Sequence, residues 1–188
     1  MTIIPNISGL TYLPDFITEA ENAALLTDID NQAWRADLKR RVQHYGYVYD
    51  YRARAISKEM SLGPLPEWLG GLTHKLVERN IFQKTPDQII VNEYEPGQGI
   101  SPHIDCVPCF GDVIASLSLG SAVNMDFRHK DEVSTLRLVP QSLLVLADEA
   151  RFQWQHAIAG RKSDRVDGQR IVRSRRISLT FRTVKITP

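Results

Sequence analysis

The 188-residue chain has little of what marks secreted, membrane or strongly basic proteins. It has only two cysteines, so its core must form without a framework of disulfides. Its 23 Lys and Arg balance 22 Asp and Glu, which argues against a histone-type nucleic-acid binder but leaves room for a local basic patch. Because the N-terminus shows no basic leader and no long apolar run, we expect no signal peptide, no membrane span and a cytoplasmic location.

The two cysteines, Cys106 and Cys109 in DCVPCF, form a C-x-x-C pair. Such a pair is half of a zinc site or a redox pair in other sequences. No second pair is present to complete a four-cysteine site, and the surroundings are not thioredoxin-like. We therefore expect two unpaired thiols in a reducing cytosol.

Length and composition predict one globular domain, with 43% hydrophobic and 24% charged residues. The front part is predicted to contain two helices, over residues 14–34 and 66–82, the first capped by Asp15 or Thr18. The second helix is weakened by the pair Gly70–Gly71.

From about residue 87 the pattern changes to short β-rich runs separated by turns. The runs are QIIVNEYE, ASLSLG, VNMDF, STLRLV, SLLVLA and RRISLTFRTV. Because no helical patterns separate them, a parallel βαβ sheet is disfavoured and an antiparallel barrel or jelly roll is predicted. The fold class is therefore mainly β with flanking helices (α+β). Residues 160–173 are polar and charged and are predicted to form a loop.

A metal site is indicated by NEYEPGQGISPHIDC, where His103 and Asp105 stand two apart in a segment with strand character. Residues i and i+2 of a strand face the same way. His156 in RFQWQHAI is the best candidate for a third ligand. Two histidines and one carboxylate with open positions form the facial triad of non-haem Fe(II) oxygenases. The alternatives are a chance H-x-D and a buried, hydrogen-bonded core histidine.

The C-terminal run RRISLTFR adds a second signal because polar and apolar residues alternate in it. One face carries Arg176, Ser178, Thr180 and Arg182, and the other carries Ile177, Leu179 and Phe181. If the polar face points into a barrel, two buried guanidiniums need anions, and a dicarboxylate co-substrate beside the metal would satisfy both. A solvated edge strand explains the alternation equally well.

Together these motifs resemble the AlkB family of Fe(II)- and 2-oxoglutarate-dependent dioxygenases, over roughly residues 88–184. The family pattern is N-x-Y-x-P-G, H-x-D, S-L-G, a histidine about fifty residues on, and R-x-N-x-T-x-R. The matching residues are Asn92, Tyr94, Pro96, Gly97, His103, Asp105, Ser118, Leu119, Gly120, His156, Arg176, Thr180 and Arg182.

The resemblance implies a single AlkB-like dioxygenase domain over residues 1–188, with a double-stranded β-helix (jelly-roll) core. Residues 1–86 would form a helical and nucleotide-recognition-lid region, and residues 87–188 the core. It also implies the site. His103, Asp105 and His156 would be the catalytic iron ligands, and 2-oxoglutarate would be bound by Asn92, Tyr94, Arg176, Ser178 and Arg182.

The implied reaction uses Fe(II), 2-oxoglutarate and O2 to oxidise alkyl groups on nucleic-acid bases, as in oxidative demethylation of DNA or RNA. Two residues depart from the family pattern. Ser178 replaces the usual Asn, and Val107 stands where many base-repairing members carry an acidic residue. The second departure speaks against direct dealkylation of methylated adenine or cytosine.

The local wording, including HYGYVYDY and EPGQGISPHID, is similar to the dioxygenase domain of the animal AlkB homologue that hydroxylates a side chain on the wobble uridine of tRNA. Hydroxylation of a wobble-uridine side chain is therefore the alternative reaction. A protein or small-molecule hydroxylase, and a binding module that has lost its chemistry, are further alternatives.

The stretch YGYVYDYRAR indicates how a base would be held. Tyr45, Tyr47, Tyr49 and Tyr51 alternate, so in a strand all four would face one way, and Arg52 follows them. Aromatic faces beside cations bind flipped or single-stranded bases. We predict a lid in which Tyr45, Tyr47 and Arg52 bind substrate, although an aromatic strand face in the core is the alternative. The expected partner is nucleic acid, DNA or RNA and possibly tRNA, bound by a monomer.

Overall fold

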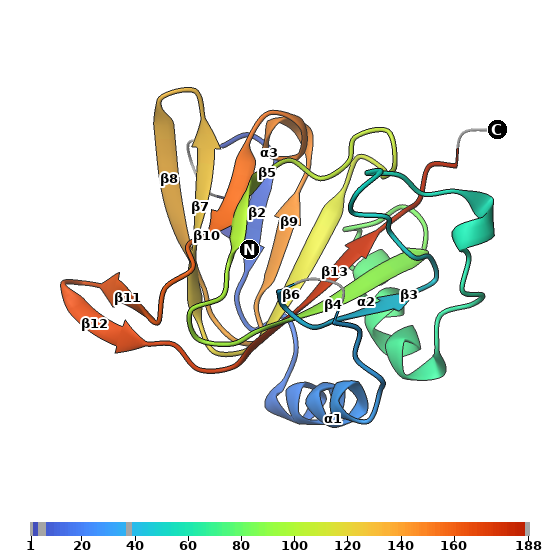
Figure 1. The fold of residues 1–188 in the computed structure, drawn as a ribbon, viewed down its shortest axis with the longest axis horizontal. Helices are drawn as coiled ribbons and strands as arrows, with labels where there is room; N and C mark the ends of the chain where they lie inside the picture. The colour runs from blue at the N-terminus through green and yellow to red at the C-terminus, as the bar shows by residue number, and fades with distance from the viewer. Residues whose placement is uncertain (1, 4–6, 37–38, 187–188) are drawn as a thin grey trace.

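The computed structural model describes residues 2–3, 7–36 and 39–186. The expectation that no leader is present falls partly on residues 1 and 4–6, which lie outside this range. The described chain forms a seven-stranded sheet, a four-stranded sheet and a two-stranded hairpin, with antiparallel pairing throughout (Figure 1). The two larger sheets face each other as in a jelly roll, so the predicted fold class is confirmed.

The larger sheet is made of strands from both halves of the chain. Its order is β1 (Thr2–Ile3), β2 (Leu10–Leu13), β9 (Leu143–Leu146), β6 (Ile114–Gly120), β13 (Arg176–Arg182), β4 (Gln88–Tyr94) and β3 (Val42–Tyr45). The front part of the chain therefore contributes three strands as well as helices. Strand β13 lies inside the sheet and pairs with β4 on one side and β6 on the other, so it is held on two sides.

The smaller sheet forms the opposite wall. Its order is β5 (Ile100–His103), β10 (Gln155–Ile158), β7 (Val123–His129) and β8 (Glu132–Leu138). The hairpin of β11 (Ser163–Val166) and β12 (Gln169–Val172) projects beyond this wall, at the lower left of Figure 1.

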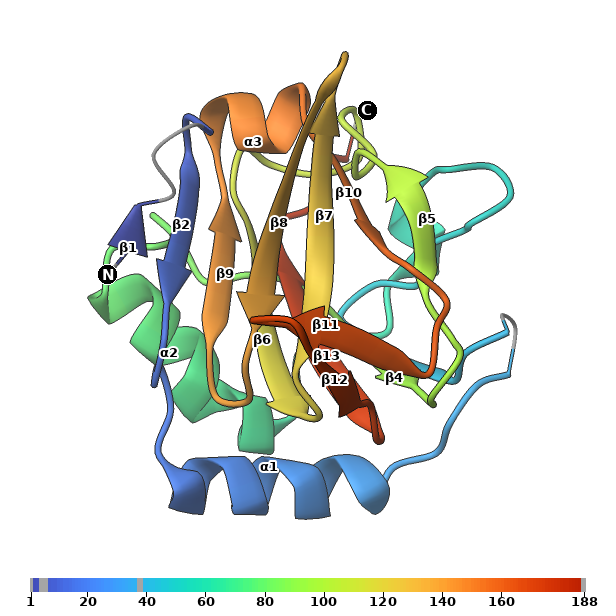
Figure 2. The same cartoon turned by 90° about the vertical axis from the view of Figure 1, so that its left-hand side faces the viewer.

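Two helices cover the outer face of the larger sheet (Figure 2). They are α1 (Glu19–Asp30) and α2 (Gly70–Glu78), and the 3-10 turn η2 (Glu67–Leu69) leads into α2. The Thr18 side chain caps α1 in a capping box with Glu21, as the sequence suggested. Both helices are confirmed, but each is shorter than predicted. A second 3-10 turn, η1 (Lys58–Met60), and a short helix, α3 (Asp148–Phe152), complete the elements.

Strand alternation divides the apolar residues between two cores. Leu117 of β6 and Leu179 of β13 pack outward with the helices, whereas Leu144 of β9 and Phe127 of β7 pack between the sheets. No helix among the described residues has the length and apolar character needed to cross a membrane.

The loop predicted over residues 160–173 is wrong, because β11 and β12 form there. Asp167 and Gly168 both have positive φ, at 50° and 80°, which suits a two-residue hairpin turn between short strands. The prediction that Cys106 and Cys109 are unpaired thiols is also wrong. The turn between Cys106 and Cys109 brings their Cα atoms to 5.3 Å, and the two sulfurs are bonded.

The prediction of one strand with four aligned tyrosines is wrong as well. β3 ends at Tyr45, and Gly46 follows with φ at +76°. A Cβ on Gly46 would lie 1.9 Å from the Asp87 carbonyl oxygen, so only glycine fits this close approach. The chain turns here, and the later tyrosines leave the strand's face.

Candidate active site

A cavity of about 670 Å³ opens between the two sheets, and its wall contains most of the residues that the sequence singled out. Strands β4 and β13 supply Asn92, Tyr94, Arg176, Ser178 and Arg182, all five of the residues expected to bind 2-oxoglutarate. His103, Asp105 and His156 also line the cavity. The polar face of β13 therefore points inward, while Leu179 and Phe181 lie in the outer core.

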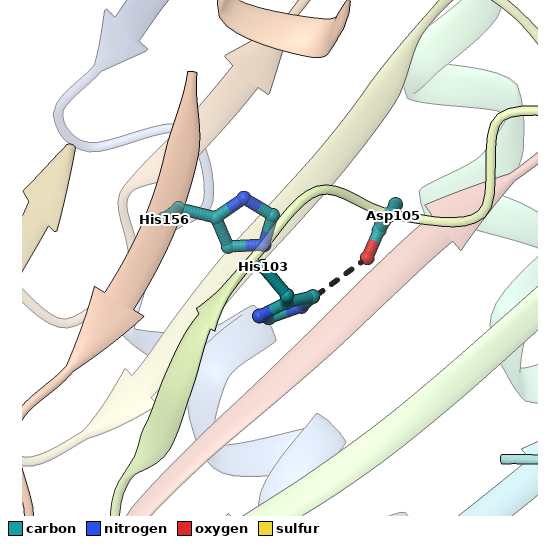
Figure 3. Close-up of side chains that lie close together, drawn as sticks. All are labelled: His103, Asp105 and His156. Carbon is teal, nitrogen blue, oxygen red and sulfur yellow. Dashed lines mark ion pairs between the residues drawn. The ribbon is translucent and has the colours of Figure 1, made fainter. Parts of the chain in front are cut away.

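The structure brings together the three candidate metal ligands (Figure 3). His103 ends β5, and His156 is its direct partner on β10, with ring centroids 4.3 Å apart. Asp105 lies two residues beyond His103, in the loop after the strand rather than on the strand itself. His103 Nε2 is 3.4 Å from Asp105 Oδ1, and one ligand atom from each residue lies within 4.8 Å of the others.

Hydrogen bonding and burial suit both histidines to metal binding. His103 Nδ1 lies 2.8 Å from the Ser101 carbonyl oxygen, so a proton on Nδ1 donates there and leaves the Nε2 lone pair free. Burial lowers the pKa of His156 to about 4, which keeps this imidazole neutral at neutral pH. Its Nδ1 is buried and has no hydrogen-bond partner among the described residues.

Asp105 is held as a carboxylate. Burial by itself would raise its pKa, but the Arg182 guanidinium and His103 outweigh that effect and hold the pKa well below the usual value. Arg182 Nε donates to Asp105 Oδ2 over 3.1 Å, and Arg182 Nη1 donates to Gln88 Oε1 over 3.1 Å. Arg182 therefore orients the carboxylate.

Arg176 is a buried cation of the cavity wall with no anionic partner among the described residues. It is 3% exposed, and only its Nη2 has a partner, the Ser118 hydroxyl at 3.0 Å. Its Nε and Nη1 are buried without partners among the described residues. Burial lowers its pKa to about 10, so the group stays charged at neutral pH. A carboxylate bound here would satisfy both orphan donors, and the cavity therefore fits a dicarboxylate beside a metal.

The three residues predicted to bind substrate do not line this cavity; Tyr49, Tyr51 and Arg54 do. Tyr45 packs edge-on against Trp68, at 5.5 Å between ring centroids, beside the outer core. Tyr47 bridges to Ser61, and Arg52 is exposed in a turn that Asp50 caps. Tyr45 thus lies on the outer side of β3, and after the turn at Gly46 the chain brings Tyr49 and Tyr51 to the cavity.

Sequence reasoning missed a further cation, Arg40. Its Nε donates to Asn92 Oδ1 over 2.9 Å, and its guanidinium lies 5.5 Å from the centre of the Tyr94 ring. With Lys39 it lines the cavity. The basic run at residues 39–41, just before the tyrosines, was the signal in the sequence, but Arg40 lies some fifty residues from Asn92 and no local pattern predicts their contact.

A family model for the 2OG-Fe(II) oxygenase superfamily matches residues 9–182, almost the whole chain. With the His-Asp-His group and the orphan guanidinium, this match defines the protein as an Fe(II)- and 2-oxoglutarate-dependent dioxygenase that uses O2.

Within that class, the chain belongs to the AlkB family. The zebrafish "Probable RNA/DNA demethylase ALKBH6" is 30% identical over 204 residues, covering 92% of this chain and 84% of that protein. The Arabidopsis thaliana "Alkylated DNA repair protein ALKBH8 homolog" is 39% identical over 209 residues, covering 97% of this chain and 60% of that protein.

A Xenopus tropicalis protein named "tRNA (carboxymethyluridine(34)-5-O)-methyltransferase alkbh8" is 36% identical over 202 residues, covering 96% of this chain. This chain spans only 32% of that relative's length. Among solved structures, OsALKBH1 superposes with a TM-score of 0.68 at 17% identity, covering 93% of this chain and 96% of that one, and it shows the same fold.

Proposed function

We propose that this dioxygenase oxidises alkyl groups on nucleic-acid bases, with demethylation of DNA or RNA as the leading reaction. In this proposal His103, Asp105 and His156 hold Fe(II). The observation that carries it is that this triad opens onto the same cavity as the orphan donors of Arg176 and the two inward tyrosines.

In this proposal the residues that line the cavity have separate roles in binding the metal and the co-substrate. Bound Fe(II) with 2-oxoglutarate supplies the oxidation of a C–H bond by O2. Arg176 binds the distal carboxylate through its free Nε and Nη1. Asn92 accepts a hydrogen bond from Arg40, which leaves its amide NH2 available to donate to the co-substrate. Asp105 keeps its negative charge because Arg182 donates to it.

The substrate side uses Tyr49, Tyr51 and Arg54. The two rings are in edge-to-face contact at 5.0 Å between centroids, and Tyr49 also contacts Phe110. Base–aromatic stacking tolerates any base, and a guanidinium at the rim attracts phosphate. Oxidation of an N-methyl group gives a hemiaminal, which breaks to release formaldehyde and the unmodified base.

Hydroxylation of a wobble-uridine side chain in tRNA is the second candidate. Val107, two residues after Asp105, is 43% exposed and offers no carboxylate to a methylated base. The relatives named for tRNA carboxymethyluridine are 36–38% identical to this chain, against 28–30% for those named as demethylases. A hydroxylated carbon on a C-linked side chain is stable, so the product would keep the added oxygen.

One experiment separates these reactions. The pure protein is incubated with Fe(II), ascorbate and 2-oxoglutarate, with methylated DNA, methylated RNA or bulk tRNA from cells grown normally. Succinate is measured together with the masses of the digested nucleosides. Loss of a methyl group supports demethylation, and a gain of one oxygen on a tRNA uridine supports the second candidate.

The lid assignment has a matched pair of controls. Arg54→Ala is expected to raise the KM for nucleic acid. Because Arg54 Nη2 also donates to the Ile104 carbonyl oxygen over 3.2 Å, between His103 and Asp105, succinate formation without nucleic acid is measured alongside. Arg52→Ala, which removes an equal charge outside the cavity, is expected to have a smaller effect. If no nucleic acid stimulates succinate formation in a protein that still converts 2-oxoglutarate, the nucleic-acid proposal fails.

A further inference from the structure

We propose that Arg151 is a positioning residue that fixes the backbone of the Asp105 loop against the strand carrying His156, and so sets metal affinity. The inference rests on the proposed function of the His103–Asp105–His156 site. Arg151 is 1% exposed and is the largest of the fully buried side chains among the described residues. It lies on α3, five residues before His156.

The guanidinium of Arg151 reaches both ends of one loop. Its Nη1 donates to the Asp105 carbonyl oxygen over 3.0 Å, and its Nη2 donates to the Cys106 carbonyl oxygen over 3.3 Å. Its Nε donates to the Gly111 carbonyl oxygen over 3.2 Å. One rigid, planar group therefore holds the start and the end of residues 105–111 at fixed positions.

The helix that carries Arg151, α3, is itself held in place by backbone hydrogen bonds. The Ala147 amide donates to the Gly9 carbonyl over 3.0 Å, and the Ala150 amide donates to the Ser8 carbonyl over 2.9 Å, which ties α3 to the turn that precedes β2. The chain then passes through buried Trp154 into β10 and His156. Arg151 thus connects the backbone of one proposed ligand to the segment of another.

Arg182 and Arg151 hold different parts of Asp105. Arg182 bonds the carboxylate, whereas Arg151 bonds the backbone carbonyl of the same residue. A carboxylate aimed by Arg182 alone would still move with its loop. With the backbone also fixed, Asp105 Oδ1 stays at its 3.4 Å separation from His103 Nε2.

The energetics argue against Arg151 being an ordinary ion pair. No carboxylate lies within 4.0 Å of its guanidinium among the described residues, and burial lowers its pKa. A buried charge whose hydrogen bonds all go to neutral carbonyls is costly, and an apolar residue would fill the space at less cost. The fixed geometry that it gives to three carbonyls is what a smaller or apolar residue could not supply.

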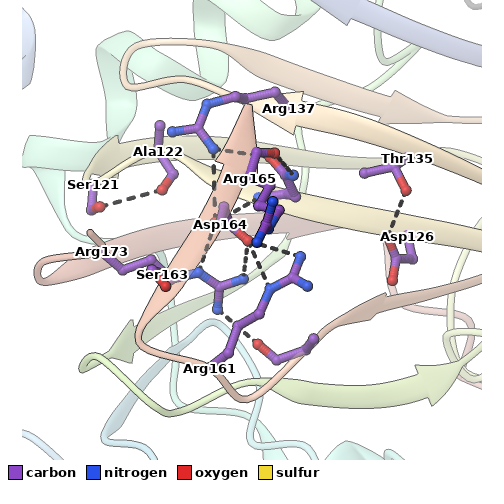
Figure 4. Close-up of polar contacts among 12 residues, drawn as sticks. Ser121, Ala122, Asp126, Thr135, Arg137, Arg161, Ser163, Asp164, Arg165 and Arg173 are labelled. Atoms are coloured by element: carbon purple, nitrogen blue, oxygen red, sulfur yellow. Dashed lines mark hydrogen bonds and ion pairs between the residues drawn. The ribbon is translucent and has the colours of Figure 1, made fainter. Parts of the chain in front are cut away.

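Arg173 provides a matched control. It is also buried, at 7% exposed, and its Nη1 donates to the Ala159 carbonyl over 2.7 Å. Its other donors bind Asp164 in the hairpin cluster shown in Figure 4. It therefore resembles Arg151 in being buried and in donating to a backbone carbonyl, but it contacts none of the three proposed metal ligands.

The test compares Arg151→Lys and Arg151→Gln with Arg173→Lys. Arg151→Gln removes the buried charge, so we expect it to disturb folding less than Arg151→Lys does. Unfolding by urea reports stability, and titration with Co(II), followed by the visible absorption of the bound ion, reports affinity and coordination geometry. We expect both Arg151 variants to bind Co(II) roughly 10–100-fold more weakly, with an altered spectrum, as for other residues that orient metal ligands. Arg173→Lys should lose stability but keep parental affinity and spectrum.

Parental Co(II) affinity and spectrum in a folded Arg151 variant would overturn the inference. So would unfolding of both Arg151 variants while Arg173→Lys folds, because Arg151 would then serve folding rather than ligand placement. Failure of the proposed function is a separate result. In that case the parent itself would bind Co(II) no better than His103→Ala, or would form no succinate.

Discussion

Asp105 and Asp164 are both buried carboxylates among arginines, at 7% and 2% exposure. Asp164 accepts two hydrogen bonds from Arg173, at 2.7 and 2.8 Å, one from Arg161 Nε at 2.9 Å and one from the Asn124 amide at 3.3 Å (Figure 4). Asp105 accepts one guanidinium bond, from Arg182, and its other oxygen faces His103 beside the cavity. The first carboxylate is saturated by the protein, and the second keeps an oxygen for a ligand.

The same contrast separates the arginines. All three nitrogens of the Arg173 guanidinium have partners, whereas two of the three in Arg176 have none among the described residues. Unsatisfied buried donors cost about 1–3 kcal/mol each, more for charged groups. A protein keeps such unsatisfied donors where a bound ligand supplies their hydrogen-bond acceptors. Burial of charge thus marks both regions, and incomplete pairing marks the functional one.

The largest effect is expected for Asp105→Asn compared with Asp164→Asn. Asp105→Asn removes the anionic ligand, and we expect conversion of 2-oxoglutarate to succinate to fall at least about 100-fold, beyond the loss typical of residues that only orient ligands. Asp164→Asn should keep most of that activity at a temperature where it is folded. Similar losses in the two variants would remove the distinction between the sites.

The next effect concerns the two buried arginines. Arg176→Met removes the donors proposed for the distal carboxylate, and charge-assisted hydrogen bonds contribute about 1.5–3 kcal/mol each. We expect the KM for 2-oxoglutarate to rise roughly 10–100-fold. Initial-rate measurements over a range of 2-oxoglutarate concentrations check this. Arg173→Met should leave that KM unchanged, and an equal rise in both variants would contradict the assignment.

For the free energy of unfolding we expect the opposite order, with a larger loss from a change in the Asp164 cluster than from one at the Asp105 site. Asp164→Asn leaves the guanidiniums of Arg173 and Arg161 without their anion, and breaking such a buried pair costs about 3 kcal/mol. The midpoint of urea unfolding should fall accordingly. An Asp164→Asn protein as stable as the parent would show that the saturated cluster is not structural.

The smallest effect distinguishes the core tyrosine from the cavity tyrosines. Burial raises the pKa of Tyr45 from 10.0 to about 12, so the unfolded chain loses this proton at lower pH than the folded one. Stability from this group is complete below pH 10 and is lost as the pH rises toward 12. Tyr45→Phe should therefore flatten the fall of the unfolding free energy with alkaline pH, without changing the KM for nucleic acid. An unchanged slope would contradict the burial of that hydroxyl.

The parts of the site that sequence predicted are those fixed by strand period. Arg176, Ser178 and Arg182 share a face because side chains alternate on a strand, and β13 is regular over its whole length. His156 was predicted from its place after a β-type segment, well beyond the His103–Asp105 pair, and the structure pairs it directly with His103.

The missed parts depend on contacts between distant segments. The inward set of tyrosines changes at Gly46, whose conformation is imposed by the Asp87 carbonyl some forty residues later. Arg151 contacts the Asp105 loop from a helix more than forty residues away, and no local pattern marks it. The Cys106–Cys109 bond depends on a turn that C-x-x-C spacing alone does not specify.

The most direct test of the contrast is the binding of Fe(II) itself. Anaerobic calorimetric titration of the apo protein in the presence of 2-oxoglutarate gives stoichiometry and affinity for the parent, Asp105→Asn and Asp164→Asn. We predict one Fe(II) per chain for the parent and for Asp164→Asn, and no binding at the same concentrations for Asp105→Asn. Parental binding by Asp105→Asn, or its loss in a folded Asp164→Asn protein, would contradict the account.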